Sequence, residues 1–111
     1  MKLDELTLGQ IRELKTLFSG DLQPQRFPIN VGENYFIRTV TMYYTGRVKA
    51  VNGDVIVLEK AAWIADTGRF YDFLKTGEAS EVEPFIDDVN IPAGSVVDWT
   101  KWSHALLESQ K

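Results

Sequence analysis

The dipeptide Asn52-Gly53 lies between two stretches of β-forming residues, and it constrains the fold more than any other feature of the chain. Residues 47–51 alternate polar and apolar side chains, as a half-buried strand does. Residues 55–58 are apolar at every position, which indicates a central strand covered on both faces. Asn-Gly suits a type I′ turn, because both of its central positions need a positive φ. The sequence therefore predicts a β-hairpin here.

Runs of β-branched and aromatic residues continue on both sides of this hairpin. We predict four further strands, at residues 35–44, 63–65, 82–86 and 95–99. Gly46 is expected to end the first of them, and Pro84 to confine its strand to a sheet edge. Residues 69–74 fit a helix and a short strand equally well. Six or seven short strands predict a mainly β fold, as a small antiparallel β-barrel or a jelly-roll-like sandwich.

Apart from the ambiguous residues 69–74, helical patterns occur at the two ends of the chain. Residues 7–18 carry an apolar stripe at three- and four-residue spacing and begin at a capping Thr7, which predicts one N-terminal helix. Residues 21–32 contain two prolines and a glycine, and predict an extended arm. The expected organisation is an N-terminal helix and arm (1–32) followed by a β domain (33–111).

Near the C-terminal end, residues 91–94 predict a turn, since Pro and Gly occupy turn positions. Thr100 is placed to cap a last short helix that contains Trp102, Leu106 and Leu107. We therefore expect the β domain to end in a helix and a polar tail.

The net charge of −4 comes almost entirely from one part of the chain. Residues 72–98 hold one basic residue, Lys75, and seven acidic residues. A nucleic-acid-binding protein usually has a basic face, because phosphate neutralisation dominates its affinity. The charge therefore argues against nucleic acid as a partner, and the acidic segment is either a solvated edge or a surface that faces a basic partner.

Catalytic and metal-binding patterns are not apparent. The chain has no cysteine, which excludes disulfides, thiolate metal ligands and a cysteine nucleophile. The one histidine, His104, follows Ser103, but neighbours along the chain do not make a catalytic pair, so we expect an incidental surface residue. The run Asp87-Asp88 lacks the alternating ligands of a calcium loop. We predict no enzyme activity, no metal and no cofactor.

Aromatic residues gather between residues 35 and 73, and the basic residues Arg38, Arg47, Lys49 and Arg69 are interleaved with them. Such a pattern occurs in platforms for single-stranded nucleic acid. The simpler interpretation is that these rings form the core, and any that stay exposed would mark a protein interface, where Tyr, Trp and Arg are enriched. We expect the core interpretation for most of them.

The segment 61–70 is the most distinctive part of the chain, because small residues flank a tryptophan and a tight turn then presents Arg69 and Phe70. Arg69 either pairs with a neighbouring carboxylate or contributes to an anchor for a partner. We predict a partner-binding surface made of Trp63, Arg69, Phe70, Tyr71 and Phe73.

The chain resembles the small accessory proteins of tailed bacteriophages, on the residues 34–41 (NYFIRTVT), 63–70 (WIADTGRF) and 81–85 (EVEPF). Its size and β-rich character are similar to those of capsid decoration or staple proteins of short-tailed phages. The resemblance implies a jelly-roll-like fold, a place on the virion capsid surface after synthesis in the host cytoplasm, and a role in clamping neighbouring major capsid proteins. It also implies a homodimer at symmetry axes, without membrane contact.

One alternative stays open. An N-terminal helix followed by a bent β-barrel with an Asn-Gly hairpin resembles the Sm-like small-barrel modules, which form rings and bind nucleic acid or a small ligand. The start of the chain has no apolar leader, and its longest apolar runs are far shorter than a membrane span, so we expect an intracellular protein.

Overall fold

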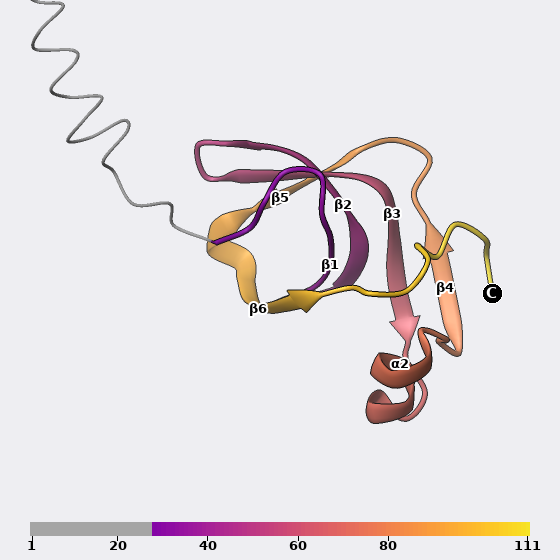
Figure 1. The fold of residues 1–111 in the computed structure, drawn as a ribbon. Coiled ribbons are helices and arrows are strands. Elements are labelled where there is room, and N and C mark those ends of the chain that lie inside the picture. Colours follow the sequence, from indigo (N-terminus) through magenta and orange to yellow (C-terminus); the bar gives the residue numbers. More distant parts are fainter. Residues whose placement is uncertain (1–27) are drawn as a thin grey trace, which may run out of the picture.

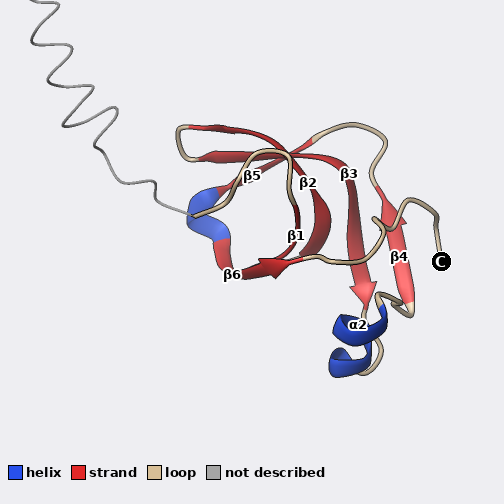
Figure 2. Cartoon of the chain, in the orientation of Figure 1, coloured by secondary structure: helices blue, strands red, loops and turns tan. Residues whose placement is uncertain are grey.

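A computed structural model describes residues 28–111 of the chain, which form one antiparallel sheet of six strands with one α-helix (Figures 1 and 2). The predicted N-terminal helix at residues 7–18 lies outside the described residues. The elements are β1 (Asn34–Thr39), β2 (Tyr43–Asn52), β3 (Val55–Asp66), α2 (Phe70–Thr76), β4 (Glu81–Pro84), β5 (Val89–Pro92), the 3-10 turn η2 (Ala93–Ser95) and β6 (Val96–Lys101). The prediction of a mainly β, antiparallel fold is confirmed, and these six strands belong to a single sheet.

The sheet has the strand order β4-β3-β2-β1-β6, and β5 also pairs with β3. One edge of β3 is therefore divided between two partners: residues 55–58 pair with β5, and residues 62–66 pair with β4. The other edge of β3 pairs with β2 through the Asn52-Gly53 hairpin, and Gly53 has a φ of 61°. The predicted hairpin and its central second strand are confirmed, but the predicted type I′ turn is wrong. Asn52 pairs with Val55 inside the ladder and has no positive φ, so the two turn residues are Gly53 and Asp54, and only Gly53 has a positive φ.

A second hairpin, between β1 and β2, was not expected. We predicted one strand across residues 35–44, but the chain turns after Thr39. The hydroxyl of Thr39 accepts a hydrogen bond from the Met42 amide at 2.9 Å, and the Thr39 amide donates to the Met42 carbonyl at 2.8 Å. The turn contains no glycine, proline or asparagine, so this local side-chain bond takes the place of the usual turn residues.

Gly46 does not end a strand, as we had predicted, but lies buried inside β2. A Cβ at this position would lie 3.1 Å from a methyl carbon of Leu58 and 3.3 Å from the Cα of Ala61. Opposite Gly46 the register between β2 and β3 shifts, and Lys60 adopts a φ of 53°. The glycine is thus required for close approach of two backbones at a β-bulge.

The bulge at Lys60 joins what we had predicted as two separate strands, residues 55–58 and 63–65, into the bent strand β3. The bend separates the part that pairs with β5 from the part that pairs with β4. It therefore lets one strand contribute to two regions of the molecule.

The ambiguous residues 69–74 resolve as the helix α2, which begins at Phe70 and buries Phe73. Gly77 ends it with a φ of 81° and donates its amide to the Phe73 carbonyl at 2.8 Å. A left-handed glycine at this position is a common helix terminator. The helix lies at one end of β3, beyond the sheet (Figure 1).

The two faces of the sheet carry two different cores, because successive side chains of a strand point to opposite faces. The first core lies around Tyr35 and Ile37 and is mostly aliphatic. Its other buried members are Ile29, Val48, Ile56, Leu58, Ala61, Val89 and Ile91. Ile29 belongs to the predicted arm, yet it is fully buried here, so the β domain begins before residue 33.

The second core lies on the opposite face, around Phe36. It joins the sheet to α2 and to the C-terminal segment, and its other buried members are Ala62, Ile64, Phe73, Ala79, Val82 and Trp102. The rings of Phe36 and Phe73 lie 5.1 Å apart, and those of Phe73 and Trp102 lie 5.0 Å apart. Aromatic contacts therefore dominate this core.

The predicted C-terminal helix is wrong. Thr100 and Lys101 belong to β6, and no helix follows among residues 102–111. This segment runs back along β4, where Val82 and Lys111 exchange two backbone hydrogen bonds of 2.9 and 3.0 Å. The apolar residues that suggested a helical face do not form one. Trp102 is a buried member of the second core, and Leu106 and Leu107 pack against that core. Residues 91–94, predicted as a turn, form the end of β5 and the start of η2.

Candidate interaction surfaces

The five residues predicted to bind a partner do not form one surface. Trp63 is 36% exposed and pairs with Tyr44, on the face of the sheet opposite Ala62 and Ile64. Phe70 and Tyr71 are exposed on α2, where the Phe70 ring contacts the second core. Phe73 is fully buried and belongs to that core, which corrects its assignment as a contact residue.

The first of two exposed aromatic regions, the α2 surface, is made by Phe70, Tyr71 and Arg38. Phe70 is 39% and Tyr71 67% exposed. The Arg38 guanidinium lies 5.5 Å from the centre of the Phe70 ring and 5.6 Å from that of Tyr43. Lys75 lies 5.8 Å from the Tyr71 ring, and Arg69 is exposed. This surface combines rings with cations, which is the composition of many protein-binding sites.

Arg38 is fixed in place by Asp98 as well as by the two rings. Its Nε donates to Asp98 at 2.7 Å, and a second nitrogen donates to the other carboxylate oxygen. This bidentate pair holds the pKa of Asp98 below its ordinary value and raises the pKa of Arg38. Both side chains are partly exposed, at 33% and 49%. The pair therefore orders the surface while both residues keep their charge.

A shallow groove of about 270 Å³ runs beside this ion pair, between α2 and strands β1 and β6. Its lining residues are Phe36, Arg38, Phe70, Leu74, Asp98, Trp99 and Thr100. Apolar walls around a few polar groups can hold an apolar side chain of a partner and orient it.

The second region, the β3–β4 surface, is made by Tyr44, Trp63, Phe85 and Ile86. Tyr44 and Trp63 are cross-strand neighbours, and the Phe85 ring lies 5.9 Å from that of Tyr44. Phe85 is 38% exposed, and Ile86 is 95% exposed. The Phe85 amide donates to the Ala61 carbonyl at 2.8 Å, which fixes the loop to β3. Tyr44, Trp63 and Phe85 thus form a group of partly exposed rings, and the exposed Ile86 follows Phe85 in the same loop.

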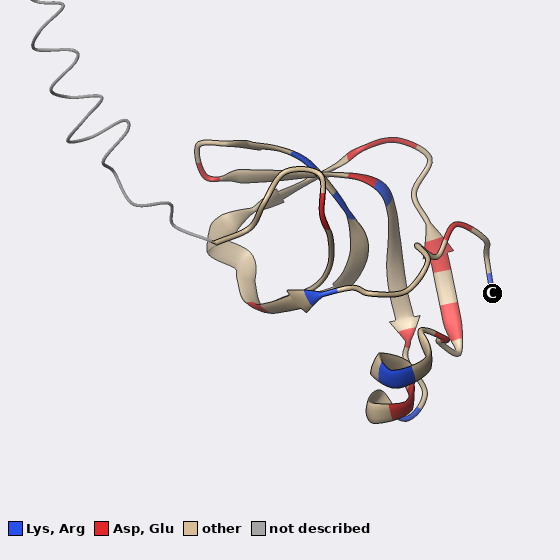
Figure 3. Cartoon of the chain, in the orientation of Figure 1, with Lys and Arg blue, Asp and Glu red and all other residues tan. Residues whose placement is uncertain are grey.

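Acidic residues border the β3–β4 surface. Glu81 and Glu83 lie on β4, with Glu83 paired in register with Trp63, and Asp87 follows Ile86 (Figure 3). The next residue, Asp88, is paired with Lys49 at 2.7 Å. Four of the seven acidic residues of the 72–98 segment thus lie on β4 or in the loop after it, whereas Asp72, Glu78 and Asp98 lie elsewhere.

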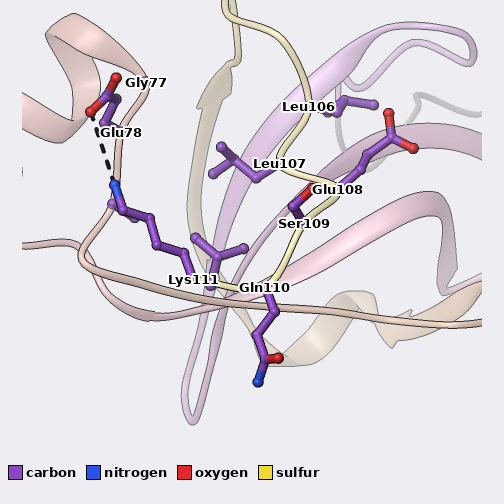
Figure 4. A pocket seen from close by; sticks show the side chains of 10 residues that line it. Gly77, Glu78, Leu106, Leu107, Glu108, Ser109, Gln110 and Lys111 are labelled. Carbon is purple, nitrogen blue, oxygen red and sulfur yellow. Dashed lines mark ion pairs between the residues drawn. The ribbon is translucent and has the colours of Figure 1, made fainter.

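A second groove, of about 370 Å³, lies where the C-terminal segment meets β4 (Figure 4). Lys111 approaches Glu78 to 3.9 Å across it, and Gln110 donates to Glu83 at 3.2 Å. Leu106 and Leu107 form part of its apolar wall. The groove is lined largely by the C-terminal segment itself, so it marks the boundary between that segment and the rest of the domain.

His104 is not an incidental surface residue, as we had predicted. One of its ring nitrogens lies 2.8 Å from the Leu74 carbonyl, and its ring packs edge-on against Trp102 at 5.0 Å. It is half-buried, and it occupies the space that a side chain at Gly77 would need. His104 therefore joins the C-terminal segment to the end of α2.

Within residues 28–111, no group of three or more His, Cys, Asp or Glu residues is arranged to hold a metal ion. In the same part of the chain, no helix is both long and apolar enough to cross a membrane.

Sequence reasoning missed the contribution of Arg38, Phe85 and Ile86 to these surfaces. Arg38 had been considered only as part of a nucleic-acid platform, and its partner Asp98 is sixty residues away in sequence. Phe85 and Ile86 were assigned to a strand that ends instead at Pro84. Pro84 itself was the available signal, because it stops the strand and leaves the two following apolar residues in a loop.

No protein-family model matches the chain, and no curated protein matches it.

Proposed function

We propose that this is a non-enzymatic structural protein of a phage particle, a decoration or staple protein that binds the outer capsid surface and clamps neighbouring major capsid subunits. The observation that carries this proposal is the pair of exposed apolar surfaces on the two faces of one sheet. The α2 surface presents Phe70 and Tyr71, and the β3–β4 surface presents Trp63, Phe85 and Ile86. A domain with two such surfaces is able to contact two neighbours at once.

Two surfaces on a rigid domain make a clamp efficient for a simple physical reason. Once one surface is bound, the second partner is held nearby at a high effective concentration, so two weak contacts give one strong attachment. Strands β1, β2 and β3 connect the two surfaces through their antiparallel ladders. The distance between the two contacts is therefore set by the sheet and costs little entropy on binding.

A second candidate, the Sm-like small-barrel module, is favoured by one feature of the topology. Strands β5 and β6 are joined directly by η2, while β5 pairs with β3 and β6 pairs with β1. The chain of neighbours β5-β3-β2-β1-β6 thus returns close to its start, as in a small barrel. Such a module would assemble as a ring and bind nucleic acid or a small ligand.

Co-sedimentation of the full chain with purified particles of the phage that encodes it tests the first proposal. We expect binding to intact particles, and a loss of at least tenfold in the amount bound for both Tyr71→Ala and Ile86→Ala, one variant for each surface. Val97→Ala is the matched control, because Val97 is 62% exposed and belongs to neither surface.

Failure of the protein to sediment with particles contradicts the clamp. A loss of binding for only one of the two surface variants contradicts the two-sided mechanism. A discrete ring in solution, together with salt-sensitive binding of an oligonucleotide, would support the small-barrel module instead.

A further inference from the structure

We propose that the β3–β4 surface docks a basic segment of its partner, in which an apolar side chain packs against Trp63 and Ile86 while Lys or Arg side chains pair with Glu81 and Asp87. This inference rests on the proposed function, because it gives the chemistry of one of the two contacts. It assigns to the partner a basic and apolar sequence.

The apolar part of the argument rests on exposure and position. Ile86 is 95% exposed, and it follows Phe85, whose ring packs on Tyr44. Trp63 lies beside Tyr44 in the register of β2 and β3. Exposed apolar residues are ordinary when they are isolated, but here Trp63 and Phe85 both lie next to Tyr44, so their exposed parts form a group. A partner side chain placed here would bury surface that water now covers.

The negative charges around the patch favour a partner segment with positive charge. Glu81 and Asp87 are exposed, and neither forms an ion pair with another residue of the 28–111 region. Glu83 accepts one hydrogen bond from Gln110 at 3.2 Å. Negative charge at the rim of an apolar patch attracts a basic partner, accelerates its association and repels acidic alternatives.

The surface is also held in a fixed shape before any partner binds. β4 pairs with β3 on one side and exchanges two backbone hydrogen bonds with Lys111 on the other. The loop after β4 is fixed by the bond from Phe85 to Ala61 and by the ion pair between Asp88 and Lys49. Little conformational entropy is therefore lost on docking.

The α2 surface provides the contrast that makes the inference specific. Its rings lie beside Arg69 and Lys75, with Asp72 as the acidic residue of the helix. A basic segment is repelled there and attracted at the β3–β4 surface. The two neighbours of the clamp are thus expected to differ in charge at their contact sites.

Binding of two synthetic peptides to the full chain tests the inference. The first is an amphipathic peptide of Lys and Leu, and the second has Glu in place of every Lys. We expect the Lys-Leu peptide to bind, with an affinity that falls as salt is raised, and the Glu-Leu peptide to bind at least tenfold more weakly.

Two double variants separate a specific site from simple net charge. Glu81→Gln with Asp87→Asn removes two charges from the β3–β4 surface, and Asp72→Asn with Glu108→Gln removes two exposed charges elsewhere. We expect the first pair to weaken Lys-Leu binding at least tenfold and the second less than twofold. Ile86→Ala should weaken it about threefold or more, without changing the urea midpoint of unfolding.

Equal weakening by the two double variants, or equal binding of the two peptides, overturns the inference. If that happens while Ile86→Ala still prevents binding to particles, the clamp stands and only the charge of its partner is wrong. If the Lys-Leu peptide binds as expected but the protein does not sediment with particles, the docking surface stands and the capsid role is wrong.

Discussion

The two cores of this domain lie on opposite faces of the same strands, yet they are built in different ways. The first core is mainly branched aliphatic residues, and much of it comes from strands joined by short hairpins. The second contains three contacting aromatic rings among its seven buried members, and it joins the sheet to α2 and to a C-terminal segment that is distant in sequence. Branched side chains suit packing within a sheet, whereas large rings fill the irregular space between elements of different kinds.

Individual polar contacts hold irregular segments against both cores. In the first core, the Tyr35 hydroxyl accepts a hydrogen bond from the Asn30 amide at 2.9 Å and donates to Glu33 at 3.0 Å. In the second core, the Trp102 indole donates to the Ala105 carbonyl at 3.0 Å, and His104 bonds to the Leu74 carbonyl. These bonds hold an irregular segment that has few ladder bonds of its own. Most of the first core is held by the ladders of β1, β2 and β3. The position of a strand in the sheet thus follows from its residue pattern, whereas the position of the C-terminal segment depends on individual side-chain hydrogen bonds.

Truncation of one residue in each core is the strongest way to test this difference. Phe73→Ala is expected to lower the free energy of unfolding by about 3–5 kcal/mol, and Ile56→Ala by about 2–5 kcal/mol, because both side chains are fully buried. Urea unfolding checks both values. Tyr71 lies on the same helix as Phe73 but is 67% exposed, so Tyr71→Ala should change the free energy of unfolding by about 0.5 kcal/mol or less.

The same experiment shows whether the two cores are one cooperative unit. Because they share strands, we expect tryptophan fluorescence and far-ultraviolet circular dichroism to give coincident transitions in both variants. A fluorescence transition in Phe73→Ala that precedes the loss of β-sheet signal would mean that the second core unfolds independently.

Two glycine substitutions compare a hairpin beside the first core with the end of α2 beside the second core. Gly53 and Gly77 both have positive φ values, of 61° and 81°. A Cβ at Gly53 would meet nothing within 4 Å, whereas at Gly77 it would lie 2.6 Å from the His104 ring. Gly53→Ala is expected to cost about 1 kcal/mol from conformation alone, and Gly77→Ala about 2–3 kcal/mol, since His104 must also move.

Thermal or urea unfolding of the two glycine variants measures this difference. Equal losses would mean that His104 shifts without cost, and that its bond to Leu74 contributes little to the second core. Gly77→Ala in a His104→Ala background should cost about as much as Gly53→Ala.

The smallest expected effect concerns the ion pair beside the α2 surface. Asp98→Asn should lower the stability by about 1 kcal/mol or less at neutral pH, because both partners are partly exposed and screened by solvent. The pKa of Asp98 in the folded protein lies below its ordinary value of 3.8. Its stabilising contribution is therefore complete above that value and is lost as the pH falls through the lower, folded pKa.

Urea unfolding of the wild type and Asp98→Asn between pH 7 and pH 2.5 measures this contribution. The difference between the two proteins should be constant down to about pH 4 and should shrink below it. A difference that is unchanged at pH 2.5 would show that the effect comes from packing rather than from charge.

Much of the sheet could be predicted from sequence because its signals are local. Gly53 marks the hairpin turn because it supplies a positive φ, and the alternation in residues 47–51 identifies a strand by itself. The errors arose where tertiary contacts replaced local signals. Gly46 resembles a strand terminator until β3 is placed against it, and residues 102–107 resemble a helix until α2 and β4 provide separate places for their apolar side chains.

The interaction surfaces could be predicted only in part, for a similar reason. Tyr71 and Phe70 are exposed as expected, but Phe73, three residues further on, lies on the buried side of the helix. While residues 69–74 fitted a helix and a strand equally well, the side of Phe73 could not be decided. Trp63 is separated from these residues by the sheet itself, because a strand directs neighbouring side chains to opposite faces.

The amino-acid sequence by itself determined that this is a mainly β, cysteine-free domain with an Asn-Gly hairpin and an acidic later segment. These properties depend on residue type and short-range periodicity. Tertiary structure alone decided that the sheet carries a core on each face, that Arg38 meets Asp98, and that the acidic residues border an exposed apolar patch. Those outcomes depend on which distant segments pair and on the bend at Lys60, and short-range periodicity does not encode pairing between distant segments.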